Sequence, residues 1–343
     1  MSARALGVLA LITVLAVGAL WYVQRPQPSP ASSEEQGLFL PGLADRLEAI
    51  TAIRARTGGG RELAHAVRTD QGWRVRNRAD YPADRESLRG LLIKLSRAER
   101  VAAKTDRPEA WPRLGLAPVE QPGAAGVELT LEGLDPPVGV IIGKPAAGED
   151  ASGTYARRSD ASGGRAWLIS ASIERPDAIA YWLDDRLLQI PARRVRAVTI
   201  DPREGETVEV RRADDDFTIA NRPADRRPLS NTVARSLARV IADLRLTDVR
   251  PVNAGSLPPQ VATARYETFD GLVVTARGFA AAQTAGRRYI RLEAKASADA
   301  PAAVREEARQ LNARFDGWAY EIREYKFVNL THNLEGVLAE PRQ

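Results

Sequence analysis

The sequence predicts an α+β protein with two related lobes, each an antiparallel sheet with a packed helix, preceded by one transmembrane helix. Three observations lead to this prediction: an apolar run without charge near the N-terminus, a series of strand-like segments that occurs twice, and an apolar stripe at helical spacing after each series. The predicted organisation is a transmembrane anchor over 1–25, a stalk over 26–46, a first lobe over 47–192 and a second lobe, an internal repeat of the first, over 193–343.

The composition is that of a globular protein. The chain has 343 residues, which is long for one domain and sufficient for two at roughly 150 residues each. It contains no cysteine, which excludes disulfides and thiolate metal sites. The net charge is +5, but arginines alternate with acidic residues, as in Asp84-Arg85-Glu86. This mixture is typical of a solvated surface, and no nucleic-acid partner is predicted.

The apolar run from Ala5 to Val23 is long enough to span a membrane, because about 20 apolar residues cross a hydrocarbon core of about 30 Å. It ends in Trp21 and Tyr22, which favour the membrane interface, and no Ala-x-Ala cleavage site follows. We therefore expect an uncleaved anchor and not a cleaved signal.

The flanks of this run predict its orientation. Arg4 precedes it, whereas Arg25 on the other side is soon followed by Glu34 and Glu35. Because positive charge favours the cytoplasm, we expect a cytoplasmic N-terminus and an exported bulk of the chain. The stretch 25–36 is rich in Pro, Ser and Gln and predicts a flexible stalk.

The internal repeat is a series of three strands and a Pro-Ala-Asp-Arg motif. Val208 and Val210 alternate with polar residues, which is typical of a half-buried strand. Asp214-Asp215-Asp216 predicts a hairpin turn and not a metal site, because neighbours on a tight turn point apart. The first copy comprises 50–53, 62–67, 72–75 and Pro82-Ala83-Asp84-Arg85, and the second comprises 198–200, 207–210, 216–219 and Pro223-Ala224-Asp225-Arg226.

Helices are predicted after each motif, with Asp84 able to cap the first and Asp225 at the matching place. A late helix and a closing strand are predicted on either side of Gly317. The apolar stripes are Leu88, Leu91, Leu92 and Leu95, then Val233, Leu237, Val240, Ile241 and Leu244, then Val304, Ala308, Leu311 and Phe315, and the closing strand presents Trp318, Tyr320 and Ile322.

The sequence predicts no catalytic, cofactor-binding or metal-binding residues. His65 and His332 lack a second ligand at zinc spacing, and no Gly-x-Ser-x-Gly elbow occurs. Gly58-Gly59-Gly60-Arg61 lacks the Lys-Ser or Lys-Thr of a phosphate loop. An enzyme is therefore disfavoured.

A resemblance to a known family extends from about Leu47 to about Val337. The motifs that carry it are Trp73-Arg74-Val75, Tyr81-Pro82-Ala83-Asp84, Leu114-Gly115-Leu116-Ala117-Pro118, Ile142-Gly143-Lys144, Tyr155-Ala156-Arg157 and Gly317-Trp318-Ala319-Tyr320-Glu321-Ile322. Together with the leucine-rich helix, these motifs resemble the domain-of-unknown-function family 4340, except that Leu114 stands where the family more often has Tyr. The resemblance implies a single-pass protein of the bacterial inner membrane with a periplasmic domain, acting with ABC-type transporter subunits and a gliding-motility-type auxiliary protein.

The expected function is that of a non-enzymatic accessory subunit of such a transporter. The alternative is a tethered periplasmic protein that binds a ligand in the cleft between its lobes. An interface with the partner is predicted near the C-terminus, where aromatic and basic residues gather, although Trp318 and Tyr320 could instead be core. The predicted interface residues are Trp318, Tyr320, Arg323, Tyr325 and Lys326.

Overall fold

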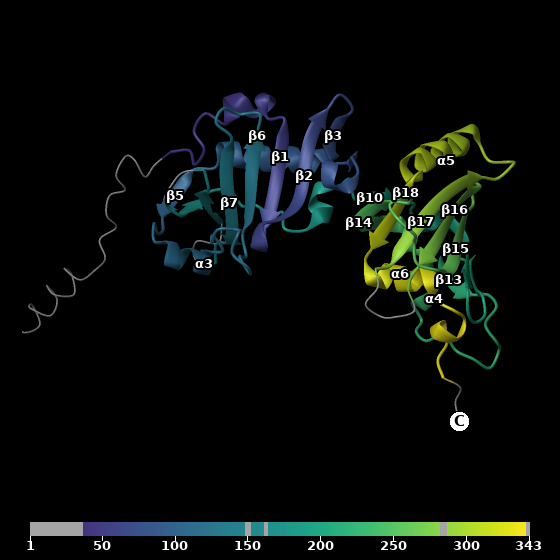
Figure 1. The fold of residues 1–343 in the computed structure, drawn as a ribbon. Coiled ribbons are helices and arrows are strands. Elements are labelled where there is room, and N and C mark those ends of the chain that lie inside the picture. The colour runs from purple at the N-terminus through teal and green to yellow at the C-terminus, as the bar shows by residue number, and fades with distance from the viewer. Residues whose placement is uncertain (1–36, 148–151, 161–163, 282–286, 341–343) are drawn as a thin grey trace, which may run out of the picture.

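The protein, described by a computed structural model over residues 37–147, 152–160, 164–281 and 287–340, forms two lobes that lie side by side (Figure 1). Each lobe contains one antiparallel sheet, and nine strands are described in each. A few helices pack on the sheets, so the predicted α+β class is confirmed at this level. No helix within the described ranges has the length and apolarity to cross a membrane, and the predicted span over 5–23 lies outside them.

The first sheet has the strand order β4-β3-β2-β1-β6-β7-β8-β9-β5. Its strands are β1 (Ala52–Thr57), β2 (Arg61–Thr69), β3 (Gly72–Val75), β4 (Tyr81–Pro82), β5 (Arg100–Ala103), β6 (Val127–Glu132), β7 (Val138–Pro145), β8 (Thr154–Arg158) and β9 (Trp167–Ile169). The helices of this lobe are α2 (Arg85–Arg97) and α3 (Trp111–Leu114), with 3₁₀ turns η1 (Ala44–Ala49), η2 (Gly58–Gly60), η3 (Arg76–Arg78), η4 (Pro108–Ala110) and η6 (Ile179–Trp182).

The second sheet has the order β10-β14-β18-β17-β16-β15-β11-β12-β13. Its strands are β10 (Arg186–Leu188), β11 (Val195–Pro202), β12 (Val208–Ala213), β13 (Asp216–Ile219), β14 (Leu244–Pro251), β15 (Gln260–Thr268), β16 (Leu272–Phe279), β17 (Tyr289–Ala296) and β18 (Trp318–Ile322). Its helices are α4 (Val233–Ala238), α5 (Ala302–Phe315) and α6 (Glu324–Thr331), with 3₁₀ turns η7 (Ala192–Arg194), η8 (Val240–Asp243) and η9 (Glu335–Val337).

Helix α2 forms as the sequence predicts. The side chain of Asp84 accepts hydrogen bonds from the backbone N–H groups of Glu86 and Ser87, which satisfies two donors that the first turn leaves free. Its four-leucine stripe is buried against the first sheet. The predicted hairpin turn is also confirmed, because Asp214, at φ 51°, and Asp215 connect β12 to β13.

The two sheets share a strand order. Read from β3, the first runs β3-β2-β1-β6-β7-β8-β9-β5, and read from β13 the second runs β13-β12-β11-β15-β16-β17-β18-β14. In both lobes the outermost strand of this series is the one that follows the helix, and it pairs with the last strand of the lobe. The internal duplication stays a prediction, which this order supports.

The Pro-Ala-Asp-Arg motif does not mark a helix start in both lobes. Asp84 caps α2, but Asp225 lies in a turn well before α4, so the predicted equivalence is wrong for the second copy. The segment after Asp225 is extended because it pairs with the C-terminal segment, where Pro228 forms a bridge with Leu338. A chain held in that pairing cannot also form the first turn of a helix.

The lobe boundaries differ from the predicted ones at two places. Phe39, Leu40 and Leu43 are buried at 1%, 3% and 1% exposure, so residues 37–46 of the predicted stalk pack in the first lobe. Strand β10 lies before the predicted boundary at 192, yet it pairs with β14 in the second sheet. Burial of apolar side chains places residues 37–46 in the first lobe. Strand pairing places β10 in the second lobe.

Candidate functional site

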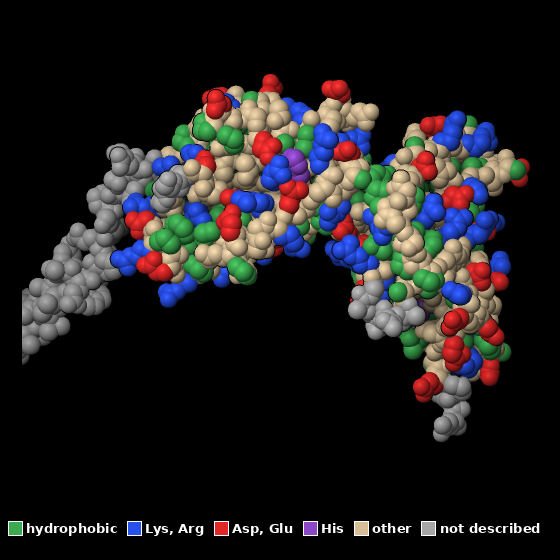
Figure 2. Space-filling view, in the orientation of Figure 1, with side chains coloured by type: hydrophobic (Ala, Val, Ile, Leu, Met, Phe, Trp, Pro, Cys, Tyr) green, Lys and Arg blue, Asp and Glu red, His purple; other side chains and the backbone are tan. Residues whose placement is uncertain are grey.

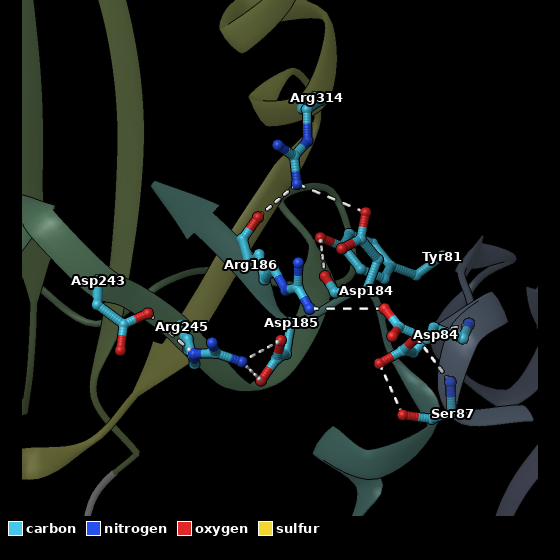
Figure 3. Close-up of polar contacts among 10 residues, drawn as sticks. Tyr81, Asp84, Ser87, Asp184, Asp185, Arg186, Asp243, Arg245 and Arg314 are labelled. Carbon is cyan, nitrogen blue, oxygen red and sulfur yellow. Dashed lines mark hydrogen bonds and ion pairs between the residues drawn. The ribbon is translucent and has the colours of Figure 1, made fainter. Parts of the chain in front are cut away.

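The segment that leads from the first lobe into the second is held to the edge of the first sheet by main-chain hydrogen bonds. The N–H of Asp84 donates to the carbonyl of Trp182 at 3.1 Å, and the N–H of Asp184 donates to the carbonyl of Pro82 at 2.9 Å. The chain then continues into β10 of the second sheet (Figure 3). One segment therefore pairs with β4 first and with β14 afterwards, and we call this region the junction.

Ion pairs reinforce the junction. The guanidinium of Arg78, in the first lobe, donates from Nε and Nη2 to the carboxylate of Asp248 in β14, at 2.5 and 3.1 Å. Their side chains are only 26% and 14% exposed. Arg314 from α5 reaches the carboxylate of Asp184 at 3.5 Å and donates to the carbonyl of Arg186 (Figure 3).

A third carboxylate at the junction, that of Asp185, is partly desolvated. Asp185 forms an ion pair with Arg245 at 3.2 Å, and Arg245 also contacts Asp243 (Figure 3). Burial raises the pKa of the Asp185 carboxyl above its ordinary value, and the Arg245 charge opposes this rise. The arrangement is that of a structural ion-pair network.

Aromatic rings fill the space where the lobes meet. Tyr81 of β4 packs edge-on against Trp318 and Tyr320 of β18, with ring centroids 5.0 and 6.4 Å apart. The hydroxyl of Tyr320 donates to the carbonyl of Arg314 at 3.0 Å. Burial raises the pKa of both tyrosines, which therefore stay protonated at neutral pH.

The five predicted interface residues separate into two groups. Trp318 is half-buried and Tyr320 fully buried, and both contact the first lobe at the junction. Arg323 is exposed immediately before α6, and Tyr325 on α6 is 56% exposed. Lys326 is half-buried, and its Nζ donates to the carbonyl of Val240. Its burial lowers the pKa of the ammonium group. Only Arg323 and Tyr325 are placed to meet a partner without rearrangement.

A groove of about 560 Å³ lies on the first lobe between η1, the β2–β3 hairpin and α2. The Arg68 guanidinium stacks over the Trp73 ring at 5.3 Å. Within the described residues, Arg85 and Arg89 of α2 have no ion-pair partner. We call this the first-lobe groove, and its lining residues are Leu47, Glu48, Arg68, Trp73, Arg85, Glu86, Leu88, Arg89, Leu92 and Ile93.

A smaller groove of about 220 Å³ lies between η7, the β12–β13 hairpin and α4. Arg212 stacks over the Phe217 ring at 4.9 Å. Asp216 accepts from Nε and Nη2 of Arg235 at 3.0 and 2.5 Å, and these bonds lower the pKa of Asp216 to about 2. We call this the second-lobe groove, and its lining residues are Ala192, Arg212, Asp215, Asp216, Phe217, Arg235 and Arg239.

The two histidines lie apart from each other in the structure, His65 in β2 and His332 after α6. His65 lies beside Arg54 and 3.9 Å from the carboxylate of Glu132, and burial lowers the pKa of His332. In the part of the chain that the structure describes, no group of three or more His, Asp or Glu could hold a metal ion. Basic and acidic side chains lie next to one another on both lobes, as the composition predicts (Figure 2).

Sequence reasoning missed the two grooves. The signal that could have found them is a cross-strand Arg and aromatic pair in each copy of the repeat, Arg68 with Trp73 and Arg212 with Phe217. The sequence alone does not reveal these pairs, because the register between two strands is not visible until the strands are paired.

The fold and these surfaces define a two-lobed α+β protein with an arginine-lined groove on each lobe and a packed junction. Residues 73–264, more than half of the chain, match the family described as Domain of unknown function (DUF4340). The chain belongs to this family. No curated protein and no solved structure shows significant similarity to it.

Proposed function

We propose that the protein is a non-enzymatic accessory subunit of an ABC-type, gliding-motility-like transporter complex in the bacterial inner membrane. A single helix over 5–23 anchors it with the N-terminus in the cytoplasm, and the two lobes lie in the periplasm. The family resemblance and the apolar run support this proposal. Its partners are the transporter subunits and an auxiliary protein.

The observation that carries the proposal is the geometry of attachment. The described chain enters the first lobe at Gly37, whose carbonyl accepts from the N–H of Arg100 at the start of β5. Strand β5 is at one edge of the first sheet and β4, at the junction, is at the other. An anchor before Gly37 would therefore hold the first lobe nearer the membrane and the second lobe farther from it (Figure 1).

The junction supports a docking role over ligand capture between the lobes. The Arg78–Asp248 ion pair and the ring contacts of Tyr81 join the lobes, and main-chain hydrogen bonds fix the segment between them to β4. The alternative, a tethered ligand-binding protein that uses the inter-lobe cleft, needs open space where Tyr81, Trp318 and Tyr320 pack against one another. A body with a fixed shape presents its surfaces at fixed positions, which lowers the ordering cost of docking.

The test is capture of the partner in intact cells. A photo-crosslinking amino acid replaces Tyr325, which is 56% exposed on α6, and the matched control replaces Phe269, which is 61% exposed at the β15–β16 turn. We expect Tyr325 to yield a cross-link to a transporter membrane subunit, and the tagged full chain to copurify with that subunit in mild detergent. A protein that purifies alone and cross-links at neither position contradicts the proposal.

The anchor has its own test. Carbonate washing of membranes should leave the full chain in the pellet, because a spanning helix is not released by loss of surface contacts. Release into the supernatant, or a mature N-terminus after Val23, contradicts the anchor.

A further inference from the structure

The two grooves occupy corresponding places in the two lobes. In the β2–β3 hairpin Arg68 lies opposite Trp73, and in the β12–β13 hairpin Arg212 lies opposite Phe217, with the same two-residue turn between the strands. A 3₁₀ turn, η1 before β1 or η7 before β11, and the helix after the hairpin complete the two grooves. Gly72 therefore stands in the first lobe where Asp216 stands in the second.

In the second lobe the chain supplies its own carboxylate. Asp216 receives two hydrogen bonds from Arg235 and a third from the N–H of Phe217 at 2.9 Å. The arginine on the helix is thus neutralised by a residue of the hairpin. The remaining space is less than half that of the first-lobe groove.

In the first lobe that carboxylate is missing. Gly72 has no side chain, its φ of 100° disfavours any other residue, and the position of an added Cβ is open within 4 Å. Arg85 and Arg89 lie one turn apart on α2 and have no ion-pair partner among the described residues. The nearby Glu86 instead lies 3.8 Å from Arg186, across the junction.

The floor of the first-lobe groove is apolar. Leu47, Trp73 and Ile93 are each partly exposed there, so an occupant can cover them and gain the free energy of apolar burial. A guanidinium pair beside an apolar floor suits an occupant that has a carboxylate next to apolar groups.

We propose that the first-lobe groove binds a peptide segment of a partner protein in which an acidic side chain is flanked by apolar side chains. The carboxylate accepts hydrogen bonds from Arg85 and Arg89, and the apolar side chains pack on Trp73 and Leu47. A peptide is the favoured occupant because an aspartate side chain fills the corresponding place in the second lobe. The inference deepens the proposed function and rests on it, since it names the chemistry that a docking partner must present.

The test measures binding of a fluorescent peptide to the full chain in detergent micelles. The probe is a ten-residue peptide with one Asp between Leu and Phe residues, and its matched control has Asn in place of Asp. We expect the Asn peptide, and the variant Arg85→Gln with Arg89→Gln, each to weaken binding at least about tenfold, because each removes hydrogen bonds between charged groups. Arg97→Gln, on the last turn of the same helix, should change binding less than about twofold.

A second variant supplies the carboxylate internally. Gly72→Asp should weaken peptide binding by occupying the arginines, and its circular dichroism and thermal midpoint report whether the lobe still folds. Equal binding of the Asp and Asn peptides, or undiminished binding by the double arginine variant, overturns the proposal. If the chain binds laurate and does not bind the peptide, the proposal is also overturned, and the groove is then a lipid site.

Failure of the groove and failure of the proposed function give different results. If wild type captures the transporter subunit and the double arginine variant captures it equally well, the groove proposal is wrong and the function stands. If wild type captures no subunit, the function fails whatever the peptide shows.

Discussion

The ion pair between Arg78 and Asp248 should contribute measurably to stability because it crosses the junction with little exposure. Two hydrogen bonds join the side chains, which are 26% and 14% exposed. Hydrogen bonds to charged groups contribute roughly 1.5–3 kcal/mol, and exposed pairs roughly 0–1 kcal/mol. Between these limits we expect a coupling free energy of about 1–2 kcal/mol.

A double-mutant cycle measures this coupling. Arg78→Met keeps the alkyl stem, and Asp248→Asn keeps the acceptor that the N–H of Val249 uses at 2.8 Å. Urea unfolding of wild type, both single variants and the double variant gives the free energies of unfolding. The exposed pair Arg76–Asp80, with side chains 57% and 56% exposed, is the control and should couple by less than about 0.5 kcal/mol. Equal coupling for the two pairs would refute the reasoning.

Two further predictions concern the core and the second-lobe groove. Leu95→Ala, at 0% exposure, should lower the free energy of unfolding by about 2–5 kcal/mol, whereas exposed Lys94→Ala should change it by less than about 0.5 kcal/mol. Because the folded pKa of Asp216 is lowered to about 2, its contribution is complete above the unfolded pKa of about 3.9 and is lost as pH falls toward 2. The stability difference between wild type and Asp216→Asn should shrink over that range; a difference independent of pH contradicts this.

The elements with a strong local signal could be predicted from the sequence. The leucine stripe of α2 and its cap at Asp84 define the helix without tertiary information. The turn at Asp214 and the alternation of Val208 and Val210 likewise depend on neighbours in the chain. These local features indicate strands together with packed helices, and this combination predicts the α+β class.

Features that depend on distant pairing could not be predicted. Asp225 lies in the same motif as Asp84, yet pairing of Pro228 with Leu338 keeps the following segment extended. The aromatic residues Trp318 and Tyr320 resemble interface residues in composition, but the first lobe covers them through Tyr81. Composition reports which side chains can anchor a partner, and only the fold decides whether that partner is another lobe of the same chain.

The two grooves suggest how related lobes can differ in role. Both keep the stacked Arg and aromatic pair of the hairpin, Arg68 with Trp73 and Arg212 with Phe217, which stabilises each hairpin locally. Gly72 of the first lobe and Asp216 of the second occupy corresponding positions, and Asp216 pairs Arg235 of α4 within the chain. An arginine that is already paired within the chain gains little by binding an external anion. Unpaired arginines beside an apolar floor are available to bind one. Of the two grooves, the first-lobe groove is therefore the one expected to bind a partner segment, and the second-lobe groove serves as its internal control.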